Sequence, residues 1–411
     1  VFPKGLNKLV NLRHVCSNFI SMGIPTGLGM LTSLRTLPTI NASEQWGGKL
    51  SELQTLSKLK GLRIEGLQHV EVQEAKEVKL GMKNNINELF LSWEGRHPTG
   101  DDLLENEKMV LEALQPHANL SSLEILCYHA KEFPPWVREM TGYGGSPLSN
   151  LVCLEINNCN KLEQLPISLK NLVALKELII SDCMNAISFL SHLECLASLQ
   201  RLELVFCNKM ENITADIAPL VSLRSIQIKY CRNMTCLSSG ISDLPSLEEL
   251  SIGGFSSELD VFPFPTIDTN YDNEDDILPS PSSSNGSEIV GRSKFKSLVR
   301  LELYGSGMDK VKSLPNSIQY LHQLRHLCIR WFRGLEDLPE WLGNLTSLRV
   351  LELYYLRNLK CLPSQAALRH LTQLEIDGCP QLKEACAMET GAEWPKLKHI
   401  PNFAVDSKQL T

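Results

Sequence analysis

The chain has 411 residues, of which 43% are hydrophobic and 21% are charged, and its formal net charge is −7. This composition is ordinary for a soluble protein with a large core, and the negative balance argues against a general binder of nucleic acid or of anionic membranes. No apolar run approaches the ~18 residues that a membrane helix needs, so no membrane span is expected. The chain starts with Val and runs straight into a repeat, which is typical of a piece of a longer protein.

The first part of the chain contains spaced apolar frames of the form L-x-x-L-x-L. Two such frames follow Pro-x-Gly turns within the first forty residues, and others begin at Leu59, Ile86 and Leu120. Between them, residues 72–81 predict a short helix, and residues 106–116 predict another. These helices are expected on the side opposite the strands.

From residue 151 the frame becomes regular, and LVCLEINNCNKLEQLP shows its full form, with a turn cysteine and a closing Leu-Pro. The cysteine returns every 24 residues, at Cys159, Cys183, Cys207 and Cys231. Alternate residues of a strand point to one side, and one such strand cannot bury its apolar face alone. The period therefore predicts parallel strands that stack on one another, with reduced, buried thiols at the turns.

One irregularity interrupts the series. Leu250 and Leu301, the middle apolar residues of two successive repeats, are 51 residues apart. The acidic, Pro/Ser-rich stretch between them, at about 255–294, predicts a disordered insert. The frames then continue to a last apolar pair, Leu397 and Ile400, which is expected to cap the series. We predict one leucine-rich-repeat solenoid over residues 1–411, a horseshoe of about fourteen coils with a parallel concave β-sheet and an irregular or short-helical convex side.

Motifs for catalysis are absent from the sequence. Gly48-Lys49 lacks the earlier glycine of a phosphate loop, since Ser43 stands there, and neither H-E-x-x-H nor G-x-S-x-G occurs. The ten histidines lack the spacing of metal ligands. We therefore expect no enzyme, no metal site and no cofactor in this chain.

Aromatic and basic residues at outward strand positions are the candidate binding residues, because both kinds are enriched where proteins bind proteins. We expect Trp331 and Tyr355, in adjacent coils, to be the centre of a recognition face. The alternative is that the rings shield strand edges and pack on each other. The full set is Trp93, Arg201, Phe206, Arg224, Lys229, Tyr230, Arg300, Tyr304, Arg325, Arg330, Trp331, Arg349, Tyr354 and Tyr355.

Four phrases resemble a known family: GIPTGLGMLTSLRTLPT, GLRIEGLQHVEVQEAKEVKLGMKNNINELFLSWEG, VLEALQPHANLSSLEILCYHAKEFPPWV and the closing WPKLKHIPNF. They resemble the leucine-rich-repeat region of plant NBS-LRR disease-resistance proteins of the coiled-coil class. The resemblance implies a cytoplasmic or nucleocytoplasmic module that senses a pathogen effector or a guarded host protein. It also implies that the module restrains the receptor's own nucleotide-binding domain, which would bind ADP or ATP and has no counterpart here.

Two other classes use similar repeats. Substrate receptors of F-box ubiquitin ligases also carry cysteine-type repeats, but they usually lack Leu-Pro endings such as Leu165-Pro166. Ectodomains of plant cell-surface receptors typically carry L-x-G-x-I-P phrases, and here only the broken form Gly-Ile-Pro occurs, at residues 23–25. Both remain as alternatives.

Overall fold

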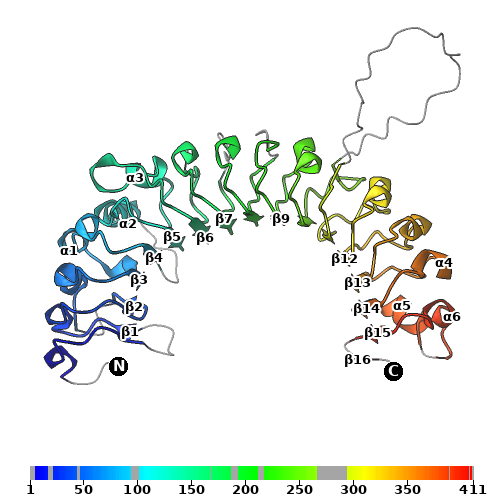
Figure 1. The fold of residues 1–411 in the computed structure, drawn as a ribbon, viewed down its shortest axis with the longest axis horizontal. Helices are drawn as coiled ribbons and strands as arrows, with labels where there is room; N and C mark the ends of the chain where they lie inside the picture. The colour runs from blue at the N-terminus through cyan, green and yellow to red at the C-terminus, as the bar shows by residue number, and fades with distance from the viewer. Residues whose placement is uncertain are drawn as a thin grey trace, which may run out of the picture. The chain divides into compact units, whose positions relative to one another are not determined.

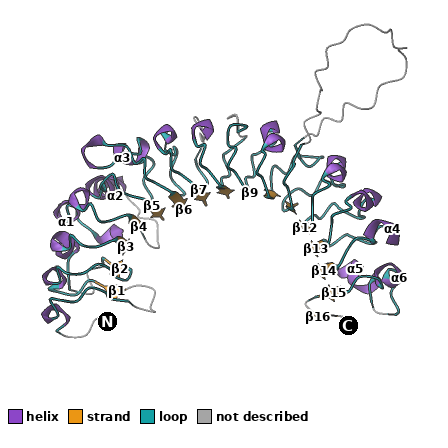
Figure 2. Ribbon diagram, viewed as in Figure 1, coloured by secondary structure: helices purple, strands orange, loops and turns teal. Residues whose placement is uncertain are grey.

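The computed structural model describes residues 5–16, 22–43, 47–93, 101–166, 168–186, 193–211, 217–265, 294–387, 389–406 and 408–409. The chain forms two compact units: unit 1 is Val1–Thr235 with Ser251–Ser256, and unit 2 is Cys236–Leu250 with Ser257–Thr411. In each unit the strands lie side by side on one face, and helical turns lie on the opposite face (Figures 1 and 2). We call these the strand face and the helical face.

The strands follow one another in chain order and pair in parallel, as the period predicts. Those of unit 1 are β1 (Met22–Gly23), β2 (Ile40–Asn41), β3 (Gly61–Glu65), β4 (Glu88–Ser92), β5 (Ser122–Leu126), β6 (Cys153–Asn157), β7 (Glu177–Ser181), β8 (Arg201–Val205) and β9 (Ser225–Lys229). Those of unit 2 are β11 (Arg300–Tyr304), β12 (His326–Arg330), β13 (Val350–Tyr354), β14 (Gln373–Asp377), β15 (Asn402–Val405) and β16 (Lys408–Gln409), of which β16 is antiparallel to β15. Strand β10 (Glu249–Gly253) contains the division between the units.

The register of the strands explains the core. Leu154 of β6 pairs with Leu178 of β7, which pairs with Leu202 of β8, and all three are at most 1% exposed. Because residues two apart share a face of a strand, the second and fourth residues of every five-residue strand point inward together. Stacked coils thus bury an unbroken apolar column, which confirms the predicted solenoid with its parallel sheet.

The helical face carries short elements. The α-helices are α1 (Val72–Glu77), α2 (Asp101–Ala113), α3 (Pro135–Arg138), α4 (Gln365–Leu368), α5 (Pro380–Ala385) and α6 (Trp394–Leu397). The 3₁₀ turns are Leu6–Lys8, Leu28–Met30, Leu50–Thr55, Leu67–His69, Leu80–Met82, Tyr143–Gly145, Leu169–Asn171, Leu193–Cys195, Ser239–Asp243, Asn316–Tyr320 and Glu340–Asn344. Both predicted helices are confirmed, although α1 ends at Glu77 rather than at residue 81, and α2 covers Asp101–Ala113 rather than residues 106–116.

The turn cysteines are buried thiols, as predicted. Cys159, Cys183, Cys207, Cys231 and Cys379 are each at most 1% exposed, and all are free. Each Sγ lies 3.5–4.0 Å from a strand carbonyl oxygen of the preceding coil, and the thiols thereby link successive coils. Burial raises the pKa of Cys379 to about 11, so this thiol stays protonated at neutral pH.

The insert differs from the prediction at its start. Phe255 and Phe262 are 1% and 2% exposed, and the ring of Phe262 packs on that of Phe332 with 5.6 Å between centroids. The prediction of disorder is therefore wrong for residues 255–265, because their phenylalanines supply enough apolar surface to dock. The remaining part of the predicted insert, residues 266–293, lies outside the described residues.

Candidate protein-binding site

The residue that directly follows a strand often adopts a backbone conformation that is uncommon for side chains other than glycine. The φ angles of Phe206 and Tyr230 are 55° and 58°, and those of Trp331 and Tyr355 are 65° and 57°. In this conformation the N–H continues the sheet: that of Phe206, for example, donates to the carbonyl of Lys229 at 3.0 Å. The other positive-φ residues at this strand-end position are Gly66, Cys127, Asn158, Asp182, Gly254, Gly378 and Asp406.

Aromatic residues at this position adopt a backbone conformation that costs free energy, and other contacts must offset that cost. The left-handed conformation costs a residue with a Cβ roughly 1–2 kcal/mol, and only glycine, asparagine and aspartate adopt it routinely. Phe206 and Tyr230 stack with centroids 4.7 Å apart and planes at 10°, and we call this pair the unit 1 stack. Trp331 and Tyr355 stack at 4.1 Å and 10°, and form the unit 2 stack. Such pairs contribute about 0.5–1.5 kcal/mol beyond their buried area, which offsets part of the cost.

Each stack ends on a glycine of the next coil. A Cβ on Gly254 would lie 2.8 Å from the ring of Tyr230, and a Cβ on Gly378 would lie 2.5 Å from that of Tyr355. Only a bare backbone therefore leaves room for the last ring of each stack. The unit 2 stack is the more accessible one, since Trp331 and Tyr355 are 38% and 40% exposed.

Trp93 follows β4 but does not belong to this surface. It is absent from the residues with positive φ, its side chain is 0% exposed, and its ring lies edge-on against Tyr128 at 5.2 Å. The expectation that Trp93 is an outward residue is therefore wrong. The backbone, not the residue type, decides the direction of the ring.

The predicted basic residues differ in their surroundings. Some are held by carboxylates: Arg201 lies 2.7 Å from Glu203, and Arg300 lies 3.6 Å from Glu249. Arg349 instead donates to the backbone carbonyls of its own loop and of His370. Arg224 and Arg325 are exposed beside the strand starts, and Lys229 is half-buried at the end of β9.

Arg330 contacts an aromatic ring, a carboxylate and a thiol. Its guanidinium lies 4.2 Å above the ring of Tyr354 and 3.7 Å from the carboxylate of Glu352, and its Nε donates to Cys328 Sγ at 2.9 Å. His326, whose Nε2 is 3.2 Å from the Glu352 carboxylate, lowers the pKa of Glu352. These contacts hold the guanidinium of Arg330 over the ring of Tyr354.

Sequence reasoning missed a row of carboxylates along the middle of the strand face. The central residue of many strands is glutamate: Glu124, Glu155 and Glu203 in unit 1, and Glu302, Glu352 and Glu375 in unit 2. Tyr304 donates its hydroxyl to Glu302 at 3.0 Å. Burial, followed by the neighbouring Glu124, raises the pKa of Glu155. The signal was visible as the recurrent phrase Leu-Glu-Leu or Leu-Glu-Ile.

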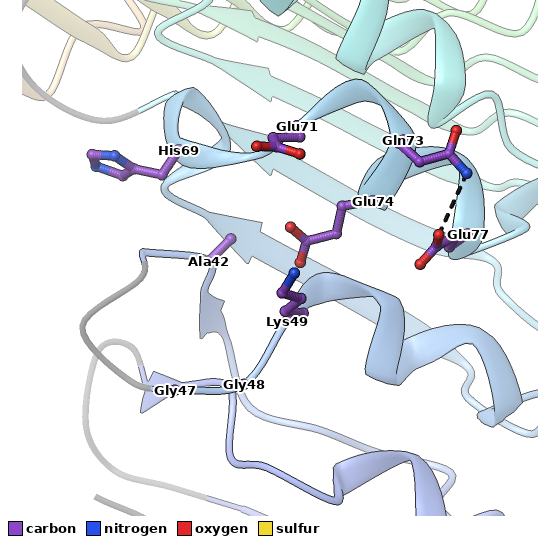
Figure 3. A pocket seen from close by; sticks show the side chains of 9 residues that line it. All are labelled: Ala42, Gly47, Gly48, Lys49, His69, Glu71, Gln73, Glu74 and Glu77. Carbon is purple, nitrogen blue, oxygen red and sulfur yellow. Dashed lines mark hydrogen bonds between the residues drawn. The ribbon is translucent and has the colours of Figure 1, made fainter.

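A polar cavity of about 290 Å³ lies elsewhere in unit 1, near α1. Glu71, Glu74 and Glu77 line it, and Lys49 points toward Glu74 (Figure 3). Glu74 already accepts the backbone N–H of Leu50, and Glu77 accepts a hydrogen bond from Gln73 at 3.4 Å. Among the described residues, no group of three or more His, Cys, Asp or Glu side chains could hold a metal ion. Across the same residues, no helix has the length and apolar character needed to cross a bilayer.

The repeated strand, the buried turn cysteine and the helical return define a leucine-rich-repeat solenoid. A family profile described as R13L1/DRL21 LRRs matches residues 50–183 and 309–379, and the chain belongs to this family of leucine-rich repeats.

Similar proteins are named for disease resistance. Disease resistance protein RGA2 of Solanum bulbocastanum is 34% identical over 140 residues, which are 34% of this chain and 14% of that protein. RPP13-like protein 1 of Arabidopsis thaliana is 34% identical over 149 residues, which are 34% of this chain and 13% of that protein. The matched part is thus a small share of either relative. Among solved structures, a leucine-rich-repeat protein of Leptospira interrogans superposes with a TM-score of 0.53 at 19% identity, covering 97% of both chains, and shows the fold alone.

Proposed function

We propose that this chain is the sensing and autoregulatory module of an intracellular plant immune receptor, and that its strand-end surface binds a pathogen effector or a guarded host protein. The named relatives support the class of receptor. The exposed stack of Trp331 and Tyr355 is the observation that carries the binding role. Aromatic residues dominate the energetic centres of protein interfaces.

The unit 2 stack suits binding because it is organised in advance. The left-handed backbone, the parallel ring contact and the glycine beneath Tyr355 leave its rings little freedom to lose. Immobilising a flexible side chain on binding costs about 0.5–1.5 kcal/mol, and ordered rings avoid most of that cost.

Autoregulation requires a second partner. In the proposed receptor, the nucleotide-binding domain that holds ADP or ATP contacts this module in the resting state, and the effector stabilises a different state. A ligand shifts such an equilibrium only by its difference in affinity for the two states. The two partners therefore oppose each other by the same coupling free energy in both directions.

The test replaces both rings of the unit 2 stack by asparagine, as Trp331→Asn with Tyr355→Asn. Asparagine occupies the same left-handed position at Asn158, so the backbone is expected to be retained. In leaf cell-death assays with a panel of effectors, the receptor that contains this chain should lose its response. The matched control is Phe206→Asn with Tyr230→Asn, which removes the less exposed unit 1 stack. If the variant Trp331→Asn with Tyr355→Asn keeps its response and its circular dichroism spectrum is unchanged, the assigned surface is wrong.

A further inference from the structure

One face of the Trp331 indole is turned toward the coil of β11, because β12 pairs with β11 on one side and with β13, the strand before Tyr355, on the other. Tyr355 covers the other face of the indole. On the open side, the strand-end residue of β11 is Gly305, whose N–H donates to the carbonyl of Arg330 at 2.8 Å. A Cβ at Gly305 would point at the ring of Phe332, 2.4 Å away, and so toward the interior. The strand-end position of this coil therefore places nothing over the indole.

The turn beyond Gly305 is open as well. Gly307 is exposed, and a Cβ built there would have no atom within 4 Å. We call the segment Gly305-Ser306-Gly307, which follows β11 in the coil next to that of Trp331, the shoulder. The unit 1 stack lacks this shoulder, since the coil before Phe206 carries Asp182 in the left-handed conformation.

Two exposed arginines follow the rings of the unit 2 stack in the sequence. Arg333 and Arg357 each follow a ring of the stack by two residues, and both are exposed. Arg333 lies 3.6 Å from Asp309 in an exposed pair, whereas Arg357 makes no salt bridge within the described residues. Arg330 is already engaged by Glu352 and Tyr354. Arg357 is therefore the cation that an acidic partner would meet.

We propose that a partner side chain completes the unit 2 stack as a third ring. An aromatic residue of the partner protein lies on the open face of Trp331 above the shoulder of Gly305 to Gly307, and a carboxylate of the same segment pairs with Arg357. We expect the ring to be uncharged, because Arg330 and Arg333 would repel a cationic side chain. This inference rests on the proposed function and defines the chemistry of the partner.

The geometry also sets the spacing between the two partner groups. The shoulder and Arg357 are two coils apart, which is about 10 Å at the ~4.8 Å separation of neighbouring strands. An extended segment advances ~3.3 Å per residue, so the acidic residue is expected three positions from the aromatic one. The motif is aromatic-x-x-Asp/Glu, in either chain direction.

The test uses short peptides and ¹⁹F NMR of the whole chain labelled with 5-fluorotryptophan, in which Trp331→Phe assigns the signal of Trp331. The probes are acetyl-Trp-Ser-Ser-Glu-amide and acetyl-Glu-Ser-Ser-Trp-amide. Their counterparts carry Lys in place of Glu, or Ala in place of Trp. At least one acidic probe should shift the Trp331 signal and bind up to ~5-fold more tightly than its Lys counterpart, as an exposed ion pair allows. The probes without an aromatic ring should not shift it.

The variant Arg357→Glu should reverse the preference between the acidic and basic probes. The matched control is Arg232→Glu, which is exposed two residues after Tyr230 of the unit 1 stack and should leave the preference unchanged. Equal binding of acidic and basic probes, or an unmoved Trp331 signal, overturns the inference. The receptor variant Trp331→Asn with Tyr355→Asn separates the two proposals. If this variant loses its effector response while the peptide test fails, the proposed function stands and only the proposed partner chemistry is wrong.

Discussion

The docked start of the insert leads to a quantitative prediction about Phe262. Its side chain is 2% exposed and packs against Phe332, which is itself fully buried just after β12. Truncation by Phe262→Ala removes the ring and leaves a hole beside Phe332. Transfer of a buried phenylalanine side chain to water accounts for about 1.5–3 kcal/mol, and the residual cavity raises the expected loss to ~3–5 kcal/mol.

The measurement is urea-induced unfolding followed by circular dichroism, together with hydrogen exchange of peptides that cover β11 and β12. Exchange in those peptides should speed up, because coils of a solenoid depend mainly on their neighbours. The matched control is Val261→Ala, one residue earlier and 73% exposed, which should stay within about 0.5 kcal/mol of the wild type. A loss below ~1 kcal/mol for Phe262→Ala would mean that the ring is not part of the core, contrary to its burial.

Three further predictions concern other parts of the chain. Burial lowers the pKa of Lys83 from 10.5 to about 8, so its charge destabilises the fold at neutral pH and this penalty fades as the pH rises from 8 toward 10.5. In urea unfolding, the free energy of unfolding of Lys83→Met relative to the wild type should therefore be about 1–3 kcal/mol higher at pH 7 than at pH 10. An equal difference at both pH values would refute the lowered pKa of Lys83. Gly378→Ala should cost ~1–2 kcal/mol of backbone strain in thermal unfolding and also displace Tyr355, whereas an unchanged melting temperature would mean that the left-handed turn is not retained. In a thiol titration with Ellman's reagent, the exposed cysteines should react fast and the buried ones only in denaturant, and rapid reaction of Cys207 would contradict its burial; the exposed ones are Cys16, Cys195, Cys236 and Cys361.

Much of the fold was readable from the residues alone. The 24-residue spacing of Cys159, Cys183, Cys207 and Cys231 predicts stacked coils, and the structure places all four thiols inside. This works because each coil contacts mainly its neighbours, so a local pattern repeated in register determines the interior. The carboxylate row was equally readable in the Leu-Glu-Leu phrases, since the middle residue of an inward pair must point outward.

The candidate site depended on the tertiary structure. Trp93 and Trp331 both directly follow a strand, yet one ring is fully buried and the other is 38% exposed. Trp331 has a positive φ angle and Trp93 does not, and no local residue pattern reveals this difference. Tyr355 likewise needs the bare backbone of Gly378, which is distant in sequence and adjacent in space. Side-chain direction is decided by contacts between coils, and those contacts exist only once the coils are stacked.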